Sequence, residues 1–238
     1  MPTVILARHG RTTANATGML AGRSRGVHLD DRGREQAVAA AGRLADLILA
    51  AVVTSPMERC RETDKLLAPA VRAVTERRLT ECDYGDWTGR PLKDLAKEPL
   101  WRGVQAHPAG VVFPGGEPMT EMSRRGVAAI RDWDARLAAA HGPDAVWVAV
   151  SHGDVIKAIL ADALGMHLDA FQRIVVDPAS LSVVRYTEMR PFVVAVNTSS
   201  GSLAHLQAPP AKRRRSRGQA RSATGDAVLG GGAGSGTP

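Results

Sequence analysis

Residues 145–165, AVWVAVSHGDVIKAILADALG, set the fold that we expect for this chain. The first part of the stretch is the most apolar run in the sequence and is typical of a strand that is covered on both faces. The second part, from Asp154 onward, is typical of a helix. A strand that leads directly into a helix is the repeating unit of an α/β domain.

The same alternation continues on both sides of this stretch. Strands are expected at residues 3–6, 50–56, 71–79, 145–153, 180–188 and 191–197, and helices at residues 30–49, 57–69, 92–98, 120–142 and 154–165. In the helix at 30–49, Asp30 is a suitable N-cap. The apolar residues of this helix at helical spacing are Ala37, Leu44, Leu47 and Ile48. The alternation predicts an α/β domain built on a largely parallel sheet.

The size and composition of the chain are those of a globular protein. Its 238 residues suit one large domain or two small ones. No apolar run approaches the roughly 20 residues needed to cross a bilayer, and the N-terminal sequence lacks the pattern of a signal peptide. Because Cys60 and Cys82 are the only cysteines, we expect a cytoplasmic protein with free thiols and no membrane association.

The positive charge of the chain is concentrated at its C-terminal end. Residues 205–238 contain six basic residues and one acid, a net charge of +5, which leaves +2 of the total of +7 for residues 1–204. We therefore expect a catalytic domain at 1–204 and a basic, Gly-rich, disordered tail at 205–238. The tail could contact nucleic acid through phosphate charge alone. Since no aromatic residues are interleaved, we expect such binding to be weak, sensitive to salt and incidental to the function.

Polar residues follow four of the expected strands. In chain order they are Arg8, His9 and Gly10, then Arg59, Glu81 and His152. Ligands of open α/β sheets gather beyond the carboxyl ends of the strands. Each of these residues taken alone is compatible with an ordinary structural role. Their shared position at one rim of the sheet indicates a functional site.

These residue types suit phosphoryl transfer. The transferring group carries spread negative charge in the transition state, and fixed arginines bind its oxygens in pairs. Arg8, Arg59 and His152 would supply this positive charge. No metal or other cofactor is therefore expected, and the sequence has none of the common metal-ligand spacings.

The remaining two chemical tasks also have candidates. A neutral imidazole such as His9 can attack phosphorus and form a phosphohistidine. A carboxylic acid such as Glu81 can protonate the leaving oxygen and then activate water. Gly10 would let the backbone approach the phosphate closely.

The sequence resembles the histidine phosphatase superfamily, whose members share the phosphoglycerate-mutase-like fold. The resemblance covers about residues 3–198 and rests on motifs that occur in the family's order. They are RHGRTTAN (8–15), LDDRGREQA (29–37), TSPMERCRET (54–63), LTECDYGDWTGR (79–90), FPGGE (113–117) and VSHGDVIKAIL (150–160). The resemblance implies a three-layer α/β/α sandwich.

It also implies roles for individual residues. His9 corresponds to the phosphorylated nucleophile, and Glu81 corresponds to the proton donor. The phosphate pocket corresponds to Arg8, Arg59 and His152. Further ligand contacts correspond to Gly10, Asn15, Ala21, Gly22 and Gly153.

Two departures from the family's mutases favour hydrolysis. Arg11 stands where mutases usually have an acidic residue, and the segment after Glu81 has fewer basic residues than theirs. We therefore expect a phosphatase for a small phosphorylated metabolite. A phosphoglycerate mutase is one alternative, and a non-catalytic phospholigand-binding protein with a tail that tethers nucleic acid is another. Asp154 is expected to cap the following helix or, less favoured, to act as a second proton relay.

Overall fold

The computed structural model describes residues 2–199 and residue 230, and its strands and helices alternate as the sequence predicts. The strands are β1 Thr3–Arg8, β2 Leu49–Thr54, β3 Val74–Thr75, β4 Val146–Ser151, β5 Leu181–Tyr186 and β6 Pro191–Thr198. The helices are α1 Thr13–Thr17, α2 Asp31–Ala41, α3 Glu58–Leu67, α4 Leu92–Leu95, α5 Pro99–Ala106, α6 Met119–His141 and α7 Gly153–Ala163. Short 3₁₀ turns lie at Arg77–Leu79, Gly85–Trp87, Pro108–Gly110 and Leu168–Arg173.

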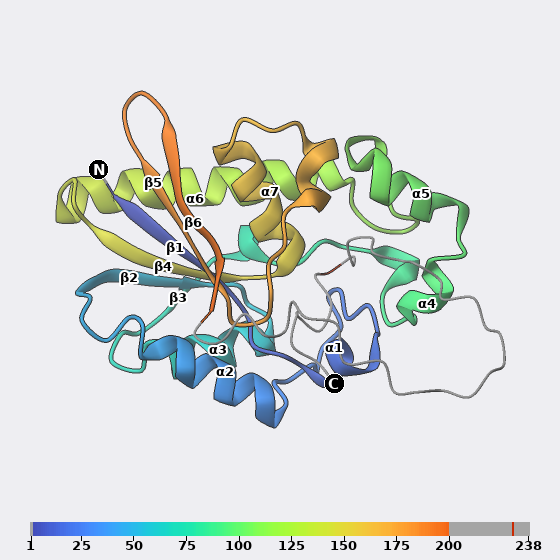
Figure 1. Ribbon diagram of the computed structural model, residues 1–238, viewed down its shortest axis with the longest axis horizontal. Helices are drawn as coiled ribbons and strands as arrows, with labels where there is room; N and C mark the ends of the chain where they lie inside the picture. Colours follow the sequence, from blue (N-terminus) through green and yellow to red (C-terminus); the bar gives the residue numbers. More distant parts are fainter. Residues whose placement is uncertain (1, 200–229, 231–238) are drawn as a thin grey trace, which may run out of the picture.

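The six strands form one mixed sheet in the order β3-β2-β4-β1-β5-β6. The pairs β1/β4, β2/β4 and β2/β3 are parallel, whereas β5 runs antiparallel to both β1 and β6. Helices α6 and α7 cover one face of the sheet and α2 and α3 cover the other (Figure 1). The expected three-layer α/β/α sandwich with a mostly parallel sheet is confirmed.

Strand β4 lies at the centre of the sheet and is buried on both faces. Trp147 and Ala149 belong to the apolar core beneath α6 and α7. Val148 and Val150 belong to the core beneath α2 and α3. Side chains of a strand alternate between its faces, so a strand between two helical layers must be apolar at every position. This is why the run at 145–150 has no polar residue.

Helix α2 begins where the sequence predicts but ends earlier. The side chain of Asp30 accepts a hydrogen bond from the N–H of Gly33 at 2.7 Å, as an N-cap does. The helix ends at Ala41 and turns follow, so the predicted end at 49 was wrong. Leu47 and Ile48 are 41% and 95% exposed, because the chain must leave the helix and return to β2.

The segment between Glu81 and α6 forms a compact subdomain beside the sheet. Its helix α5, which the sequence analysis did not anticipate, starts with Pro99 in the first turn. The rings of Trp87 and Trp101 stack at 6.2 Å, and Trp87 packs edge-on against Phe113 at 5.4 Å. These aromatic contacts hold the segments around Trp87, Trp101 and Phe113 together.

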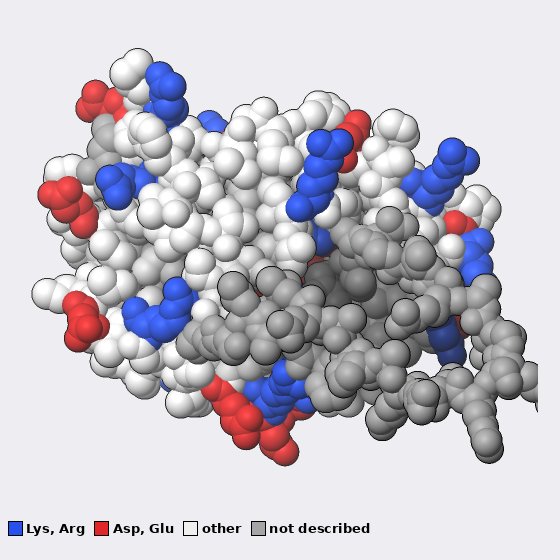
Figure 2. All heavy atoms as spheres, in the orientation of Figure 1, with Lys and Arg blue, Asp and Glu red and all other residues white. Residues whose placement is uncertain are grey.

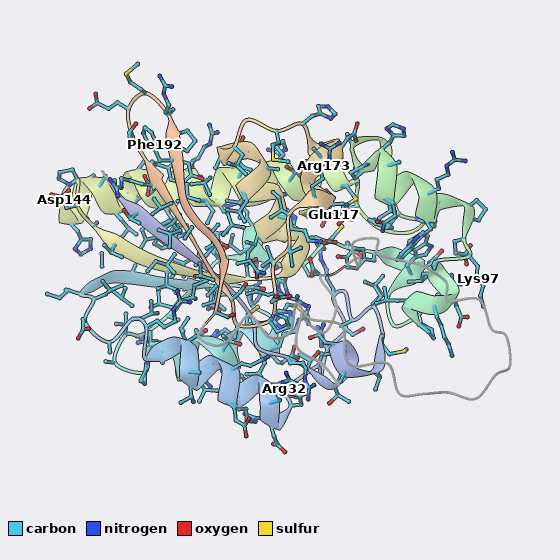
Figure 3. The ribbon with its side chains drawn as sticks, in the orientation of Figure 1. Arg32, Lys97, Glu117, Asp144, Arg173 and Phe192 are labelled. Carbon is cyan, nitrogen blue, oxygen red and sulfur yellow. The ribbon has the colours of Figure 1, made fainter. Side chains whose placement is uncertain are left out.

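On the face that Figure 2 shows, the charges of the described residues are dispersed. Figure 2 shows single Lys, Arg, Asp and Glu residues scattered over the described part of one face. At the edge of the sheet, Phe192 on β6 is half exposed (Figure 3). No helix within residues 2–199 is long and apolar enough to span a membrane. The expected disordered tail at 205–238 lies outside the described residues, apart from Gly230.

Two glycines allow α2 to touch the segment that follows β1. A Cβ on Gly33 would lie 2.0 Å from the carbonyl oxygen of Arg11, and one on Gly10 would lie 2.4 Å from the carbonyl oxygen of Gly33. These are backbone contacts, which cannot move aside as a flexible side chain can. The approach of the helix to the strand end therefore requires glycine at both positions.

We expect Gly33→Ala to lower the free energy of unfolding by about 2 kcal/mol or more, because the added methyl group forces α2 away from the strand end. Urea denaturation of the two proteins gives the difference. Gly42→Ala is the matched control at the other end of the helix, where φ is −58° and the nearest atom to an added Cβ is 3.5 Å away. This control should be as stable as the parent or slightly more stable. Equal losses in the two variants would contradict the argument.

Candidate active site

The topology of the sheet brings the predicted site residues together. Arg8 ends β1 and pairs in register with Ser151 at the end of β4, and the N–H of His9 donates to the carbonyl of Ser151 at 3.0 Å. His152 follows at once as the N-cap residue of α7. The five predicted catalytic residues are at most 3% exposed: Arg8, His9, Arg59, Glu81 and His152.

His9 is held as a neutral imidazole in one tautomer. Its Nδ1 lies 2.8 Å from the carbonyl oxygen of Gly10, which can only accept, so Nδ1 carries the proton. Its Nε2 accepts a hydrogen bond from Nε of Arg59 at 3.3 Å. Burial, together with the charges of Arg59 and Arg8, holds the pKa of His9 well below its usual value. The free lone pair of the ring therefore faces the guanidinium of Arg59.

Arg59 lies in the first turn of α3 and is the central cation of the site. Its Nη2 donates to Nδ1 of His152 at 3.1 Å and to the carbonyl of Gly22 at 2.8 Å. Its Nη1 is buried and has no hydrogen-bond partner among the described residues. A buried N–H of a cation without an acceptor is costly, and an anionic ligand would satisfy it.

His152 is the second neutral imidazole of the site. Its Nε2 lies 2.8 Å from Oγ of Ser55 and its Nδ1 accepts from Arg59. The rings of His9 and His152 meet edge-on at 5.3 Å. Burial and the charge of Arg59 lower the pKa of His152 well below its usual value. The buried thiol of Cys60 lies 3.5 Å from Nε2, and burial raises its pKa to about 12, so it packs against the ring as a neutral group.

Arg8 is the second buried arginine whose charge acts on His9. Its Nη1 donates to the carbonyl of Val176 at 2.8 Å, and its Nη2 donates to the carbonyl of Gly230 at 3.1 Å. Burial lowers the pKa of Arg8 to about 10, which leaves the group charged at neutral pH. Gly230 also lines the cavity in front of His9. A peptide carbonyl therefore stands against Arg8 where an anionic oxygen could bind.

Glu81 is the carboxyl group of the site. Its Oε1 accepts from the N–H of Cys82 at 2.9 Å, and its Oε2 lies 4.0 Å from Nδ1 of His152. Burial and the negative charge of Asp154 raise its pKa to about 7, against the opposing charges of Arg59 and Arg8. A carboxyl group with such a pKa can donate a proton at neutral pH and accept one back.

The cavity in front of His9 is lined by both polar and apolar residues. They are His9, Thr12, Asn15, Met19, Leu20, Ala21, Gly22, Arg59, Glu81, Tyr84, Leu92 and Gly230. The predicted contact residues Asn15, Ala21 and Gly22 are among them. Asn15 uses its Oδ1 in the capping box of α1, so its NH₂ group is the part left for a ligand.

Three predicted contact residues, Arg8, Gly10 and Gly153, are not among those that line the cavity, and the predicted catalytic residue His152 is not among them either. Gly10 donates its N–H to Oγ of Thr63 at 3.0 Å, and its missing Cβ leaves room for α2 rather than for a ligand. Gly153 starts α7 behind His152. Arg11 is bound to Asp30 at 2.8 Å, so its guanidinium is used to hold the cap of α2.

A cluster of three charged residues that the sequence analysis did not single out holds the backbone of Glu81. Arg125 donates from Nη2 to the carbonyl of Glu81 at 3.0 Å and from Nη1 to the carbonyl of Thr80 at 2.6 Å. Arg23 donates to the same Glu81 carbonyl at 2.9 Å. Both arginines pair with Glu117, which lies just before α6 and is labelled in Figure 3. The motif FPGGE, which ends at Glu117, is the only sequence signal for this cluster.

A family model of the histidine phosphatase superfamily (branch 1) matches residues 4–199. The chain belongs to this superfamily. A probable phosphoglycerate mutase GpmB of Yersinia pestis is 34% identical over 215 residues, which cover 88% of this chain and 97% of that protein.

Solved structures of histidine phosphatases have the same architecture. A putative alpha-ribazole-5'-P phosphatase of Escherichia coli superposes with a TM-score of 0.71 at 25% identity, over 82% of this chain and 96% of that one. A mycobacterial glucosyl-3-phosphoglycerate phosphatase superposes with a TM-score of 0.74 at 25% identity, over 83% and 99% of the two chains. The superfamily thus includes relatives named as phosphatases and relatives named as mutases.

We expect Arg125→Lys to lower the free energy of unfolding by about 2 kcal/mol, because a single ammonium group cannot satisfy the carbonyls of Arg78, Thr80 and Glu81 at once. Denaturation by urea measures this loss. Arg124→Lys is the matched control one residue away, since Arg124 is exposed and bonds Glu121 on its own helix. The control should leave stability unchanged. An Arg125→Lys variant with an unchanged free energy of unfolding would show that the cluster does not hold the backbone around Glu81.

Proposed function

We propose that the chain is a phosphomonoester hydrolase that acts on a small phosphorylated metabolite through a phosphohistidine formed on His9, without a metal ion. The observation that carries this proposal is the state of His9. A neutral imidazole presents the lone pair of Nε2 to a buried arginine that still has one N–H without a partner. A nucleophile and an oxyanion-binding group therefore meet at one point.

In the first step, Nε2 of His9 attacks phosphorus and the bond from phosphorus to the ester oxygen breaks. The departing oxygen takes the proton of Glu81, so the alcohol leaves in neutral form. In the second step, the Glu81 carboxylate takes a proton from a water molecule. The oxygen of this water then attacks phosphorus as hydroxide. The bond to His9 breaks, and inorganic phosphate is released with the imidazole neutral again.

The charge of the phosphoryl group is met by fixed groups throughout both steps. Arg59 and Arg8 are buried, so their attraction for an anion is screened little by water. Burial, together with the same two charges, keeps the two imidazoles neutral. Binding of the phosphate dianion would relieve the repulsion between the arginines.

Hydrolysis is favoured over phosphoryl transfer between two sites of a bisphosphate. Arg59 is the only Lys or Arg among the described residues that line the cavity. Two nearby arginines are already paired: Arg23 with Asp83 and Glu117, and Arg90 with Glu98. A second phosphate group would find little free positive charge. The similarity to a probable phosphoglycerate mutase GpmB keeps mutase activity as the second candidate.

We assign the catalytic activity to residues 1–204. The basic residues of the tail at 205–238 have no part in the proposed chemistry. A non-catalytic phospholigand-binding protein is the third candidate. It would retain the cations of the site and would not form a phosphorylated enzyme.

We expect His9→Ala to lower phosphatase turnover by several orders of magnitude, because no other group can take the phosphoryl transfer through two steps. Turnover is measured with a panel of phosphomonoesters, and thermal unfolding shows that the variant is folded. His28→Ala is the control, since His28 is exposed and bonds Glu62 away from the cavity. Retained turnover in His9→Ala would exclude the mechanism.

Two further measurements separate the candidates. Acid-labile label that is trapped on the wild type but not on His9→Ala identifies a phosphohistidine enzyme and excludes the pure binding protein. Conversion of 3-phosphoglycerate to 2-phosphoglycerate that depends on a bisphosphate activator would identify a mutase instead. We expect the first result and not the second.

The pH dependence of kcat/KM should reflect the two shifted groups. Glu81 must be protonated for the first step, so the rate should fall as the pH rises through about 7. His9 must be neutral, and its lowered pKa should place the rising limb well below the usual 6.5 of histidine. The measured values are divided by the fraction of substrate in its dianionic form. A falling limb near the ordinary pKa of a glutamate would contradict this assignment.

A further inference from the structure

Asp154 is a fully buried carboxylate beside the site to which the mechanism above gives no task. It lies in the first turn of α7, two residues after His152, with 0% of its surface exposed. The expectation that it caps this helix was wrong, because the N-cap position is His152 and makes no side-chain cap bond. Its side chain instead contacts Tyr84, Gly230 and Lys157.

The contacts of Asp154 are those of an ionised carboxylate. Its Oδ2 accepts from the hydroxyl of Tyr84 at 2.7 Å and from the N–H of Gly230 at 3.1 Å. Its Oδ1 lies 3.4 Å from Nζ of Lys157, which is itself buried and bonds Gln172 at 3.0 Å. Each of these partners is a donor. The N-terminal turn of α7 also favours negative charge.

Asp154 is linked by two hydrogen bonds to residues of the cavity that Glu81 lines. Both Tyr84 and Gly230, which donate to Oδ2, line this cavity together with Glu81. After burial, the charge of Asp154 is the largest influence that raises the pKa of Glu81. Two buried carboxyl groups that influence each other in this way cannot both ionise without a large cost in free energy. Asp154, which has more hydrogen-bond donors around it, keeps the negative charge, and Glu81 keeps a proton.

The other groups that face Glu81 act in the opposite direction or are neutral. Arg59 on α3, Arg8 on β1 and the N–H of Cys82 all favour its ionised form. His152 on α7, 4.0 Å away, has a lowered pKa and is neutral. The hydroxyl of Tyr84 and the thiols of Cys60 and Cys82 have raised pKa values and are neutral as well. Of these groups, Asp154 alone opposes the two arginines.

We propose that Asp154, held by Tyr84 and Lys157, is a positioning residue that keeps the proton on Glu81 until the leaving oxygen takes it. This inference rests on the proposed role of Glu81 as proton donor. Without Asp154, burial would still favour the protonated form of Glu81, but the two arginines would draw the proton off at a lower pH. The acid step would then slow above that lower pH for any alcohol that needs a proton to leave.

The test is the pH profile of kcat/KM for Asp154→Asn, with an alkyl phosphate whose alcohol is a poor leaving group. We expect the falling limb to move to lower pH by roughly one unit, because a neighbouring negative charge is lost. At pH 8 the rate should then fall about tenfold relative to the wild type, while the rate at pH 5 changes little. With p-nitrophenyl phosphate, whose alcohol leaves without help, the variant should keep most of its activity.

Asp134→Asn is the matched control. Asp134 on α6 is also a buried aspartate, but it accepts from Nε1 of Trp147 on β4 and does not line the cavity, so its substitution should leave the limb in place. If Asp154→Asn does not fold, Asp154→Ser removes the same charge with a smaller side chain. The pH profile of kcat/KM for the wild type is a further test. A falling limb below pH 5 in this profile would overturn the inference without any variant.

Glu81→Gln separates failure of this inference from failure of the proposed function. If Glu81→Gln loses alkyl phosphatase activity but Asp154→Asn leaves the limb unmoved, Glu81 is the acid and Asp154 does not set its proton. That result would overturn the inference alone. If Glu81→Gln is fully active with the alkyl phosphate, the acid itself was assigned wrongly and both fail.

Discussion

The site depends on two arginines, Arg8 and Arg59, that are both buried close to the nucleophile. Together with burial, the charges of Arg59 and Arg8 lower the pKa of the His9 imidazole. Removing two like charges from water is costly unless something compensates for them. The hydrogen bonds to backbone carbonyls compensate in part, and the N–H of Arg59 that has no partner marks what is still missing. A phosphate dianion supplies the missing acceptor and the compensating negative charge. The cost of burying the two arginines in the free protein is therefore relieved when the dianion binds.

The rest of the fold holds these charges at a fixed distance from the nucleophile. The register between β1 and β4 sets Arg8 opposite Ser151 and thereby sets His9 beside His152. Close approach of α2 at Gly10 and Gly33 fixes the backbone that leaves β1. On the far side, Arg125 and Arg23 hold the carbonyl of Glu81. Small displacements of a reacting group cost large factors in rate, so rigid backbone on both sides is part of the chemistry.

The sequence predicted the sheet and the residues at its rim because both are encoded locally. An apolar run such as 145–150 can only be a buried strand, and polar residues that directly follow such strands meet at one edge. It did not predict the partner of Arg11, because Asp30 is 19 residues away and no local pattern pairs them. Nor did it give the reason for Gly10, since the atom that excludes a side chain there belongs to α2. Local patterns identify the residues of the site, whereas long-range contacts decide what each one does.

The different roles of Glu81 and Asp154 illustrate the same point within the site. Both are buried carboxyl groups, and nothing in their side chains distinguishes a proton donor from a fixed anion. Asp154 receives the hydroxyl of Tyr84, the ammonium of Lys157 and the start of a helix. Glu81 receives one backbone N–H and faces a neutral ring at 4.0 Å. The richer set of donors takes the charge, which leaves the proton where a leaving oxygen can reach it. Environment, rather than residue type, therefore assigns acid and anion in this site.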